Sequence, residues 1–270
     1  MIKNLKLIAI DMDGTTLRDD KTISPRTKEA IKRLISRGII IVPSTGRPSL
    51  NLIEEVLGIE GIDYSITSNG AQLTDYKNKK IIHEAYLPAD AAVDTIRRLK
   101  SFNGYIYAHS DDKSLNAPDP YGESQKEIPN ILKDQKEAIE MMEEYILKNK
   151  PPIQKIAMLS RSREDQNRVL SSKHLFKNIN VNSSGANNIE FNSLEASKGI
   201  ALRRLCRMLN IPREQVAAIG DNENDLSMLR FAGYKVAMGN ALASVKKAAN
   251  EITLTNQEDG VAAFLEKIAI

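Results

Sequence analysis

Four consecutive β-branched residues at 39–42 limit the possible folds of this chain more than any other feature. A strand without polar residues has no face for water, so this run is typical of a central strand in a parallel sheet covered by helices on both sides. A helix is predicted just before it, because Ser24 is a good N-cap, Pro25 suits the first helical position, and apolar residues recur at helical spacing until Gly38. The pattern predicts an α/β fold.

A second apolar run, at residues 5–10, predicts another buried strand, which ends abruptly at the sequence Asp11-Met12-Asp13-Gly14-Thr15. Strand, helix and strand in this order form a right-handed unit whose two strand ends lie side by side, so we expect Thr45 to lie near Asp11. Open α/β sheets bind their ligands at this edge. Because burying two anions is costly, Asp11 and Asp13 indicate a bound cation.

The order of predicted elements divides the chain into a core and an insert. A helix is predicted at 50–57, a strand at 64–67 and a hairpin at 72–84, with Lys77, Lys79 and Lys80 at its solvated tip. Residues 87–191 alternate strands and helices and include a stretch rich in turn-forming residues at 111–129, but no loop gathers acidic and phosphate-binding residues. We therefore expect an inserted α+β domain at 87–191, with the core formed by 1–86 and 192–270.

Composition excludes several classes of partner. With 38 basic and 35 acidic residues the net charge is only +3, and no long basic run is present, so neither nucleic acid nor a membrane surface is an expected partner. No apolar segment approaches the roughly 20 residues that cross a bilayer, and no signal peptide is recognised, so a cytoplasmic location is expected. Cys206 lies in a helical run and is expected to be a packed or partly exposed thiol and not a nucleophile. His83, His109 and His174 lack ligand spacing, so surface or structural roles are expected.

Several motifs, in this order along the chain, resemble the haloacid dehalogenase (HAD) superfamily of phosphatases that form an aspartyl phosphate, and most closely its Cof-type branch. The motifs are DMDGT, STGR, SNGA, SKG, GDNENDLSM, VAMGNA and EDGV. The resemblance covers the whole chain, strongly in the core but only by size and position in the insert. It implies a Rossmann-like parallel-sheet core with a cap domain. The implied activity is Mg²⁺-dependent hydrolysis of phosphomonoesters of small metabolites, with sugar phosphates favoured and the oligomeric state left open.

The resemblance implies separate roles for the acidic residues. Asp11 is the expected nucleophile, since an ionised carboxylate needs no general base. Asp13 is the expected general acid and base, which requires a raised pKa. The implied Mg²⁺ ligands are the side chains of Asp11 and Asp221 and the backbone carbonyl of Asp13. Asp225 is expected to help through water or by orienting its neighbours.

A second group of residues is expected to surround the phosphoryl group. These candidates are the backbone N–H groups of Met12 and Gly46, the hydroxyl of Thr45, the amide of Asn224 and the ammonium of Lys198. Lys198 follows the candidate N-cap Ser197, and a lysine at a helix start is unfavourable for the helix dipole, which favours a catalytic role. Arg47 has three interpretations, as a substrate contact, a cap contact or a surface ion pair. Asn69 either contacts the substrate or only shapes its turn.

Three alternatives stay open beside the phosphatase. A phosphomutase could use the same core to return the phosphate to a bound sugar. A signalling receiver also groups acidic residues, a threonine and a lysine around Mg²⁺, but its acceptor lies on a later strand and it has no large insert. A binding protein of the HAD fold that has lost catalysis is disfavoured, because every catalytic position is filled.

Overall fold

The computed structural model describes residues 4–49, 56, 58–110, 113–115, 135–183 and 187–268. The chain forms two compact units. The first comprises Met1–Arg47, Leu52–Glu84 and Ser197–Ile270, and the second comprises Pro48–Asn51 and Ala85–Ala196. Nearly all of the helix expected at 50–57 and most of the turn-rich stretch at 111–129 lie outside the described residues.

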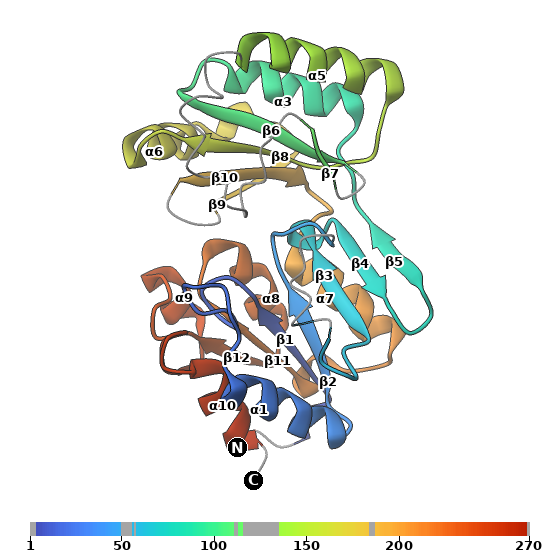
Figure 1. Ribbon diagram of the computed structural model, residues 1–270, viewed down its shortest axis with the longest axis vertical. Coiled ribbons are helices and arrows are strands. Elements are labelled where there is room, and N and C mark those ends of the chain that lie inside the picture. The colour runs from blue at the N-terminus through green and yellow to red at the C-terminus, as the bar shows by residue number, and fades with distance from the viewer. Residues whose placement is uncertain are drawn as a thin grey trace. The chain divides into compact units, whose positions relative to one another are not determined.

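An eight-stranded sheet organises the described part of the first unit (Figure 1). From one edge to the other its strands are β13 (Glu251–Ile252), β12 (Tyr234–Ala237), β11 (Val216–Gly220), β1 (Leu7–Asp11), β2 (Ile40–Ser44), β3 (Tyr64–Thr67), β4 (Gln72–Asp75) and β5 (Lys80–Glu84). All neighbours from β13 to β3 are parallel, whereas β4 and β5 continue the sheet as an antiparallel hairpin. The predicted α/β fold with a parallel sheet is confirmed.

The middle of this sheet is formed by the two apolar runs seen in the sequence. β1 is buried along its whole length and lies between β11 and β2, with Leu7 opposite both Val216 and Ile40. Burial on both faces explains why neither strand alternates between polar and apolar residues.

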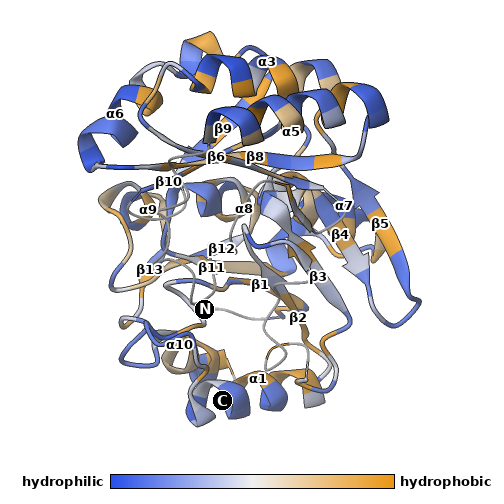
Figure 2. Cartoon of the chain, turned by 45° about the horizontal axis from the view of Figure 1, so that its top comes forward, coloured by the Kyte–Doolittle hydropathy of each residue, from blue (hydrophilic) through white to orange (hydrophobic). Residues whose placement is uncertain are grey.

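Helices cover both faces of the sheet (Figure 2). They are α1 (Pro25–Ser36), α7 (Lys198–Met208), α8 (Leu226–Phe231), α9 (Ala243–Ala248) and α10 (Gly260–Ile268). α1 packs with α10, and α7 packs with α8 over the other face. The two predicted N-caps are confirmed, since Ser24 Oγ accepts the N–H of Thr27 and Ser197 Oγ accepts that of Ile200. Cys206 of α7 is packed in the core, as predicted, and burial raises the pKa of its thiol to about 11.

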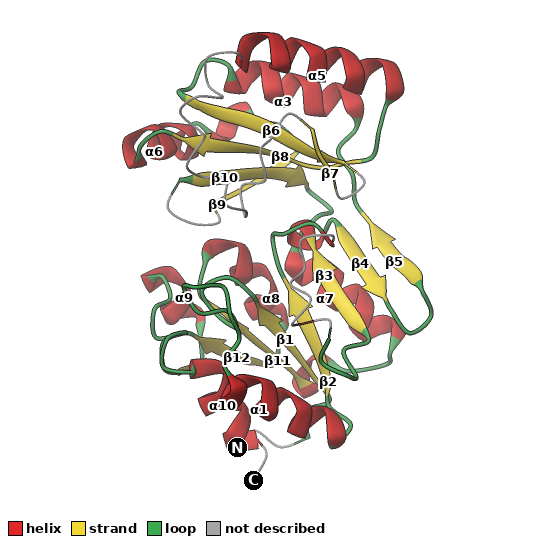
Figure 3. Cartoon of the chain, in the orientation of Figure 1, coloured by secondary structure: helices red, strands yellow, loops and turns green. Residues whose placement is uncertain are grey.

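The second unit contains an antiparallel sheet with helices on one face (Figure 3). Among the described residues its strands are, in spatial order, β7 (Lys113–Leu115), β6 (Gly104–Ser110), β8 (Ile153–Ser160), β10 (Asn188–Ser193) and β9 (Ile179–Ser183). The helices are α3 (Ala89–Leu99), α5 (Gln135–Asn149) and α6 (Arg163–Ser171). Alternate strand residues, such as Ile106, Met158 and Phe191, join these helices in one apolar core.

The other face of the second sheet carries a buried ion pair. Lys155 of β8 contacts Glu190 of β10, and both side chains are fully buried. His109 lies opposite Lys155 in the neighbouring strand β6. Burial, and then the charge of Lys155, lower the pKa of His109 to about 2, so this imidazole is neutral.

None of the helices within the described ranges is long and apolar enough to span a bilayer.

Candidate active site

Three loops of the first unit meet at the carboxyl edge of the parallel strands. Asp11 is the last residue of β1, and it pairs in register with Ser44, the last residue of β2. Thr45 therefore starts its loop beside the end of β1. Asp221 directly follows β11, which is the neighbour of β1 on the other side. The parallel topology thus brings together motifs that lie about two hundred residues apart in the sequence.

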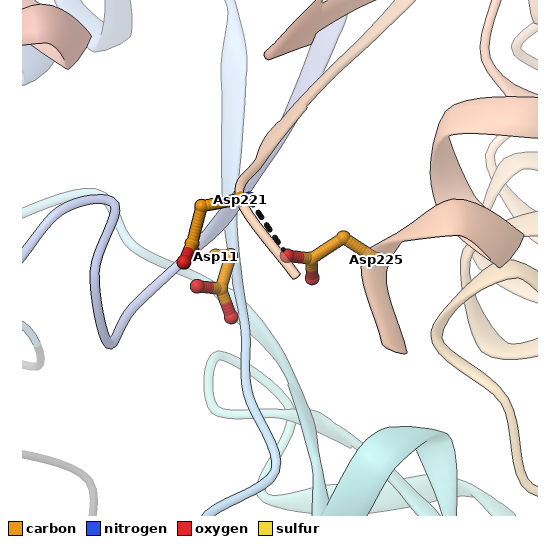
Figure 4. A group of neighbouring side chains, drawn as sticks. All are labelled: Asp11, Asp221 and Asp225. Carbon is orange, nitrogen blue, oxygen red and sulfur yellow. Dashed lines mark hydrogen bonds between the residues drawn. The ribbon is translucent and has the colours of Figure 1, made fainter. Parts of the chain in front are cut away.

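Asp11, Asp221 and Asp225 form an acidic cluster at this edge. One carboxylate oxygen of each lies within 4.8 Å of the others. Figure 4 shows the side chain of Asp221 pointing toward Asp11, while Asp225 approaches from the turn before α8. Burial, and then the charge of Asp225, raise the pKa of Asp11 well above its usual range and that of Asp221 to about 6. These shifts mean that the ionised carboxylates are destabilised at this site. A bound cation would reduce that destabilisation.

Gly14 allows the first loop to approach this cluster. Its backbone is left-handed, with φ of +79°, and a Cβ placed there would lie 2.6 Å from Oδ2 of Asp221. Thr15, the next residue, donates its hydroxyl to Oδ1 of Asp221 at 2.8 Å. A glycine followed by a small hydroxyl residue therefore suits the close contact between the first and last loops of the site.

Lys198 lies between two members of the cluster. Its Nζ is 2.5 Å from Oδ1 of Asp11 and 2.6 Å from Oδ1 of Asp225, and the side chain is fully buried. Burial alone would lower the pKa of Lys198, but the charges of Asp11 and Asp225 raise it above its usual value. The lysine is therefore charged, and these ion pairs offset its unfavourable position in the first turn of α7.

Asp225 shapes the loop that carries Asp221. While its Oδ1 binds Lys198, its Oδ2 accepts the backbone N–H groups of Asp221 at 2.9 Å and Asn222 at 3.0 Å. Each oxygen thus already has a partner within the protein. Of the two roles expected for Asp225, this geometry favours orienting its neighbours.

Asp13 points to a different partner. Arg47 binds it with two hydrogen bonds, from Nε to Oδ2 at 2.7 Å and from NH2 to Oδ1 at 2.6 Å, and Lys21 adds a third at 3.0 Å. Burial opposes ionisation of Asp13, but the hydrogen bond and charge of Arg47, together with Lys21, lower its pKa. This is the opposite of the raised pKa that a general acid requires. Arg47 does form an ion pair, in which its own side chain is buried while the Asp13 carboxylate stays partly exposed.

The candidate phosphate contacts come from several segments of the first unit. Thr45 is buried, and its hydroxyl accepts the backbone N–H of Arg47 at 3.1 Å. Asn224 donates its amide Nδ2 to Oδ1 of Asn69 at 3.1 Å, so these two residues interact with each other. Met12 is buried directly after Asp11.

Comparison with known proteins identifies the family to which this site belongs. A family model of haloacid dehalogenase-like hydrolases matches residues 8–265. The chain belongs to this family. The phosphatase YwpJ of Bacillus subtilis (strain 168) is 33% identical, over 98% of this chain and 100% of the relative. The 5-amino-6-(5-phospho-D-ribitylamino)uracil phosphatase YcsE of the same organism is 31% identical, over 96% of this chain and 94% of the relative.

The fold of this HAD-like hydrolase has a close structural match. A haloacid dehalogenase-like hydrolase from B. subtilis is similar with a TM-score of 0.80 and 30% identity, over 97% of this chain and 99% of that structure. The family and its named phosphatases make the chain a hydrolase of phosphomonoesters.

Some contacts in the site of this HAD-like hydrolase were not predicted from its sequence. The hydroxyl of Thr16 donates to the backbone carbonyl of Asp11 at 2.6 Å, and the amide of Asn240 donates to the carbonyl of Gly14 at 2.8 Å. Asn240 lies in the VAMGNA motif, so a signal for it was present. The sequence held no signal for Thr16 or Lys21. Their contacts with Asp11 and Asp13 depend on how the loop after β1 folds back on itself.

Proposed function

We propose that this hydrolase is a Mg²⁺-dependent phosphatase of small phosphorylated metabolites that works through an aspartyl phosphate. The observation that carries the proposal is the environment of Asp11, which ends a central strand with Lys198 on one oxygen and Asp221 beside it. A fixed carboxylate, a charged donor and a cation-binding cluster are the parts that phosphoryl transfer to an aspartate needs.

The residues present fit a divalent cation. The cluster offers only oxygen donors, which Mg²⁺ prefers, and the raised pKa values of Asp11 and Asp221 reflect burial and the neighbouring charge of Asp225, which a bound cation would offset. Asp11 and Asp221 would hold the ion with their side chains and Asp13 with its carbonyl, while Asp225 keeps Asp221 in place. When bound, the ion reduces the repulsion between the carboxylates and the phosphate.

In the proposed reaction, Asp11 forms a bond to phosphorus as the bond to the substrate's alkoxide breaks. Lys198 keeps the attacking carboxylate in position and neutralises part of its charge. Water then attacks the aspartyl phosphate, which releases phosphate and restores Asp11. Thr45, Lys198, Asn224 and the backbone N–H groups of Met12 and Gly46 would surround the phosphoryl oxygens.

Asp13 would exchange the protons in both steps. Its ionised form, paired with Arg47, suits the second step, in which a base takes a proton from water. In the first step the departing alkoxide takes a proton from Asp13, so Asp13 must first take up a proton from solvent, which requires its pair with Arg47 to loosen when substrate binds.

Sugar phosphates and related polyol phosphates are the proposed substrates. The YcsE relative is named for a phosphate on a ribityl chain. The assignment of residues 87–191 as a cap that selects substrates stays a prediction.

A panel of sugar, polyol and nucleotide phosphates, assayed for phosphate release with Mg²⁺ or with a chelator, tests the proposal. Activity should require the ion, and acid-quenched protein should carry covalent phosphate. Asp11→Asn should lose both, whereas Asp90→Asn, at an exposed position of α3, should retain both. Full activity in Asp11→Asn would exclude the proposed nucleophile, and transfer of phosphate to a sugar in place of water would indicate a phosphomutase.

A further inference from the structure

Three consecutive residues of the SNGA motif have left-handed backbones. The values of φ are +48° at Ser68, +58° at Asn69 and +91° at Gly70. Side chains disfavour this conformation, and single residues adopt it more readily than runs. Such strain persists where the surroundings fix the backbone, and it is concentrated at functional sites.

The contacts of this turn reach two of the loops that form the active site. The N–H of Ser68 donates to the carbonyl of Arg47 at 2.8 Å, and the N–H of Asn69 donates to that of Thr45 at 3.0 Å. On its other side, Oδ1 of Asn69 accepts the amide of Asn224. Asn69 thus connects the loop after β2 with the loop after β11.

Gly70 brings the same turn against the start of α7. A Cβ on Gly70 would lie 2.3 Å from the carbonyl oxygen of Ser197 and 2.9 Å from the backbone nitrogen of Lys198. The turn is therefore in contact with the backbone that carries Lys198, as well as with Thr45 and Asn224. The turn therefore links the residues that are proposed to hold the phosphoryl group.

We propose that Asn69 is a positioning residue that orients the amide of Asn224 toward the phosphoryl group. The amide of Asn224 has two N–H donors, and when one of them binds Asn69 the direction of the other is fixed. Both side chains lie almost entirely within the protein, with exposures of 2% for Asn69 and 9% for Asn224. In this proposal the side chain of Asn69 acts through its hydrogen bond to Asn224 and not by contact with the substrate. This inference rests on the phosphate-binding role proposed above for Asn224.

Inhibition by inorganic phosphate, together with kcat and KM, tests this role in single and double variants. Asn69→Gly removes the side chain but retains a residue that adopts positive φ readily. It should raise the inhibition constant of phosphate about five-fold, the factor that corresponds to one hydrogen bond of about 1 kcal/mol. KM should rise in parallel, with a smaller change in kcat. The matched control is Asn210→Gly, because Asn210 is exposed and also left-handed, with φ of +54°, and it should leave these constants unchanged.

The double variant separates positioning from direct contact. If Asn69 acts through Asn224, then Asn69→Gly combined with Asn224→Ala should bind phosphate no more weakly than Asn224→Ala alone. Effects that multiply, or an unchanged inhibition constant in Asn69→Gly, would overturn the inference. If Asn224→Ala itself has no effect on phosphate, the proposed role of Asn224 fails and the inference fails with it. Should Asn69→Gly not fold, Asn69→Ser removes the same acceptor and the same outcomes apply.

Discussion

Replacing Asp221 with asparagine should stabilise the metal-free enzyme while abolishing its activity. Asp221 is a half-buried carboxyl beside Asp225, and its pKa is raised to about 6. The substitution removes the charge but retains an oxygen that can accept the hydroxyl of Thr15. The metal-free protein thus loses a repulsion, and the active site loses an expected ligand.

The size of the effect follows from the shift in pKa. A rise from the usual value of 3.8 to about 6 is about 2 pKa units, or about 3 kcal/mol at about 1.4 kcal/mol per unit. Between these two values the folded state binds more protons than the unfolded state, so the free energy of unfolding of the wild type falls as pH rises from about 4 to about 6. An asparagine side chain does not titrate, so the free energy of unfolding of the Asp221→Asn variant does not fall in this way. Its stability relative to the wild type is therefore greatest above about pH 6.

Thermal unfolding in the presence of a chelator, from pH 4 to pH 7.5, measures this difference. At pH 7.5 the variant should unfold several degrees above the wild type, whereas at pH 4 the two should nearly coincide. Adding Mg²⁺ should raise the unfolding temperature of the wild type more than that of the variant. Asp90→Asn is the matched control at an exposed position and should change stability by less than about 0.5 kcal/mol. A wild type at least as stable as the variant at pH 7.5 would refute the reasoning, as would a difference independent of pH.

Three further substitutions or probes test other parts of the structure. Lys155→Met removes the cation that pairs with the buried Glu190 and should destabilise the second unit by about 3–5 kcal/mol in urea unfolding; adding Glu190→Leu should restore most of this, and an additive loss would contradict the pairing. Gly70→Ala places a methyl group against the carbonyl of Ser197, so it should cost more than about 2 kcal/mol and lower kcat/KM; wild-type stability would show that the turn tolerates a side chain. Cys206 should react with a thiol reagent only after denaturation, because its thiol is buried and its pKa is raised to about 11, and rapid labelling of the native protein would count against this packing.

The neighbouring positions of the first two strand ends could be predicted from the sequence, because they follow from local patterns. Unbroken apolar runs identify parallel strands, and polar loops after such strands must meet at one edge of the sheet. This reasoning placed Thr45 near Asp11, whereas the resemblance to the HAD superfamily implied that Asp221 joins Asp11. It also gave Ser197 as the N-cap that precedes Lys198.

The pairing of side chains within the site could not be predicted, because it depends on distances between loops that are remote in sequence. Arg47 pairs with Asp13 and reverses the expected direction of its pKa shift. Asp225 directs its oxygens to Lys198 and to backbone N–H groups. Both residues were predicted from the sequence as members of the site, but their partners required the geometry.

The second unit shows the limit of pattern analysis more plainly. Alternation along an antiparallel strand normally separates a buried face from a solvated one. On the face of β8 that points away from the helices, Lys155 is nevertheless fully buried with Glu190. The sequence could show that the two faces differ, but not that a charge on one of them is removed from water.

The central position of β1 has a consequence for the order in which the protein can fold during synthesis. On one side, β1 forms its hydrogen bonds with β11. The pairing of Leu7 with Val216 can therefore form only after residue 216 has left the ribosome. The residues between them contain a sheet whose strands all belong to the second unit, and that sheet can form earlier. The nascent chain therefore carries an unfinished strand edge beside Asp11 for most of its synthesis. Catalytic competence then arises in one late, cooperative event when the final strands pair with the first.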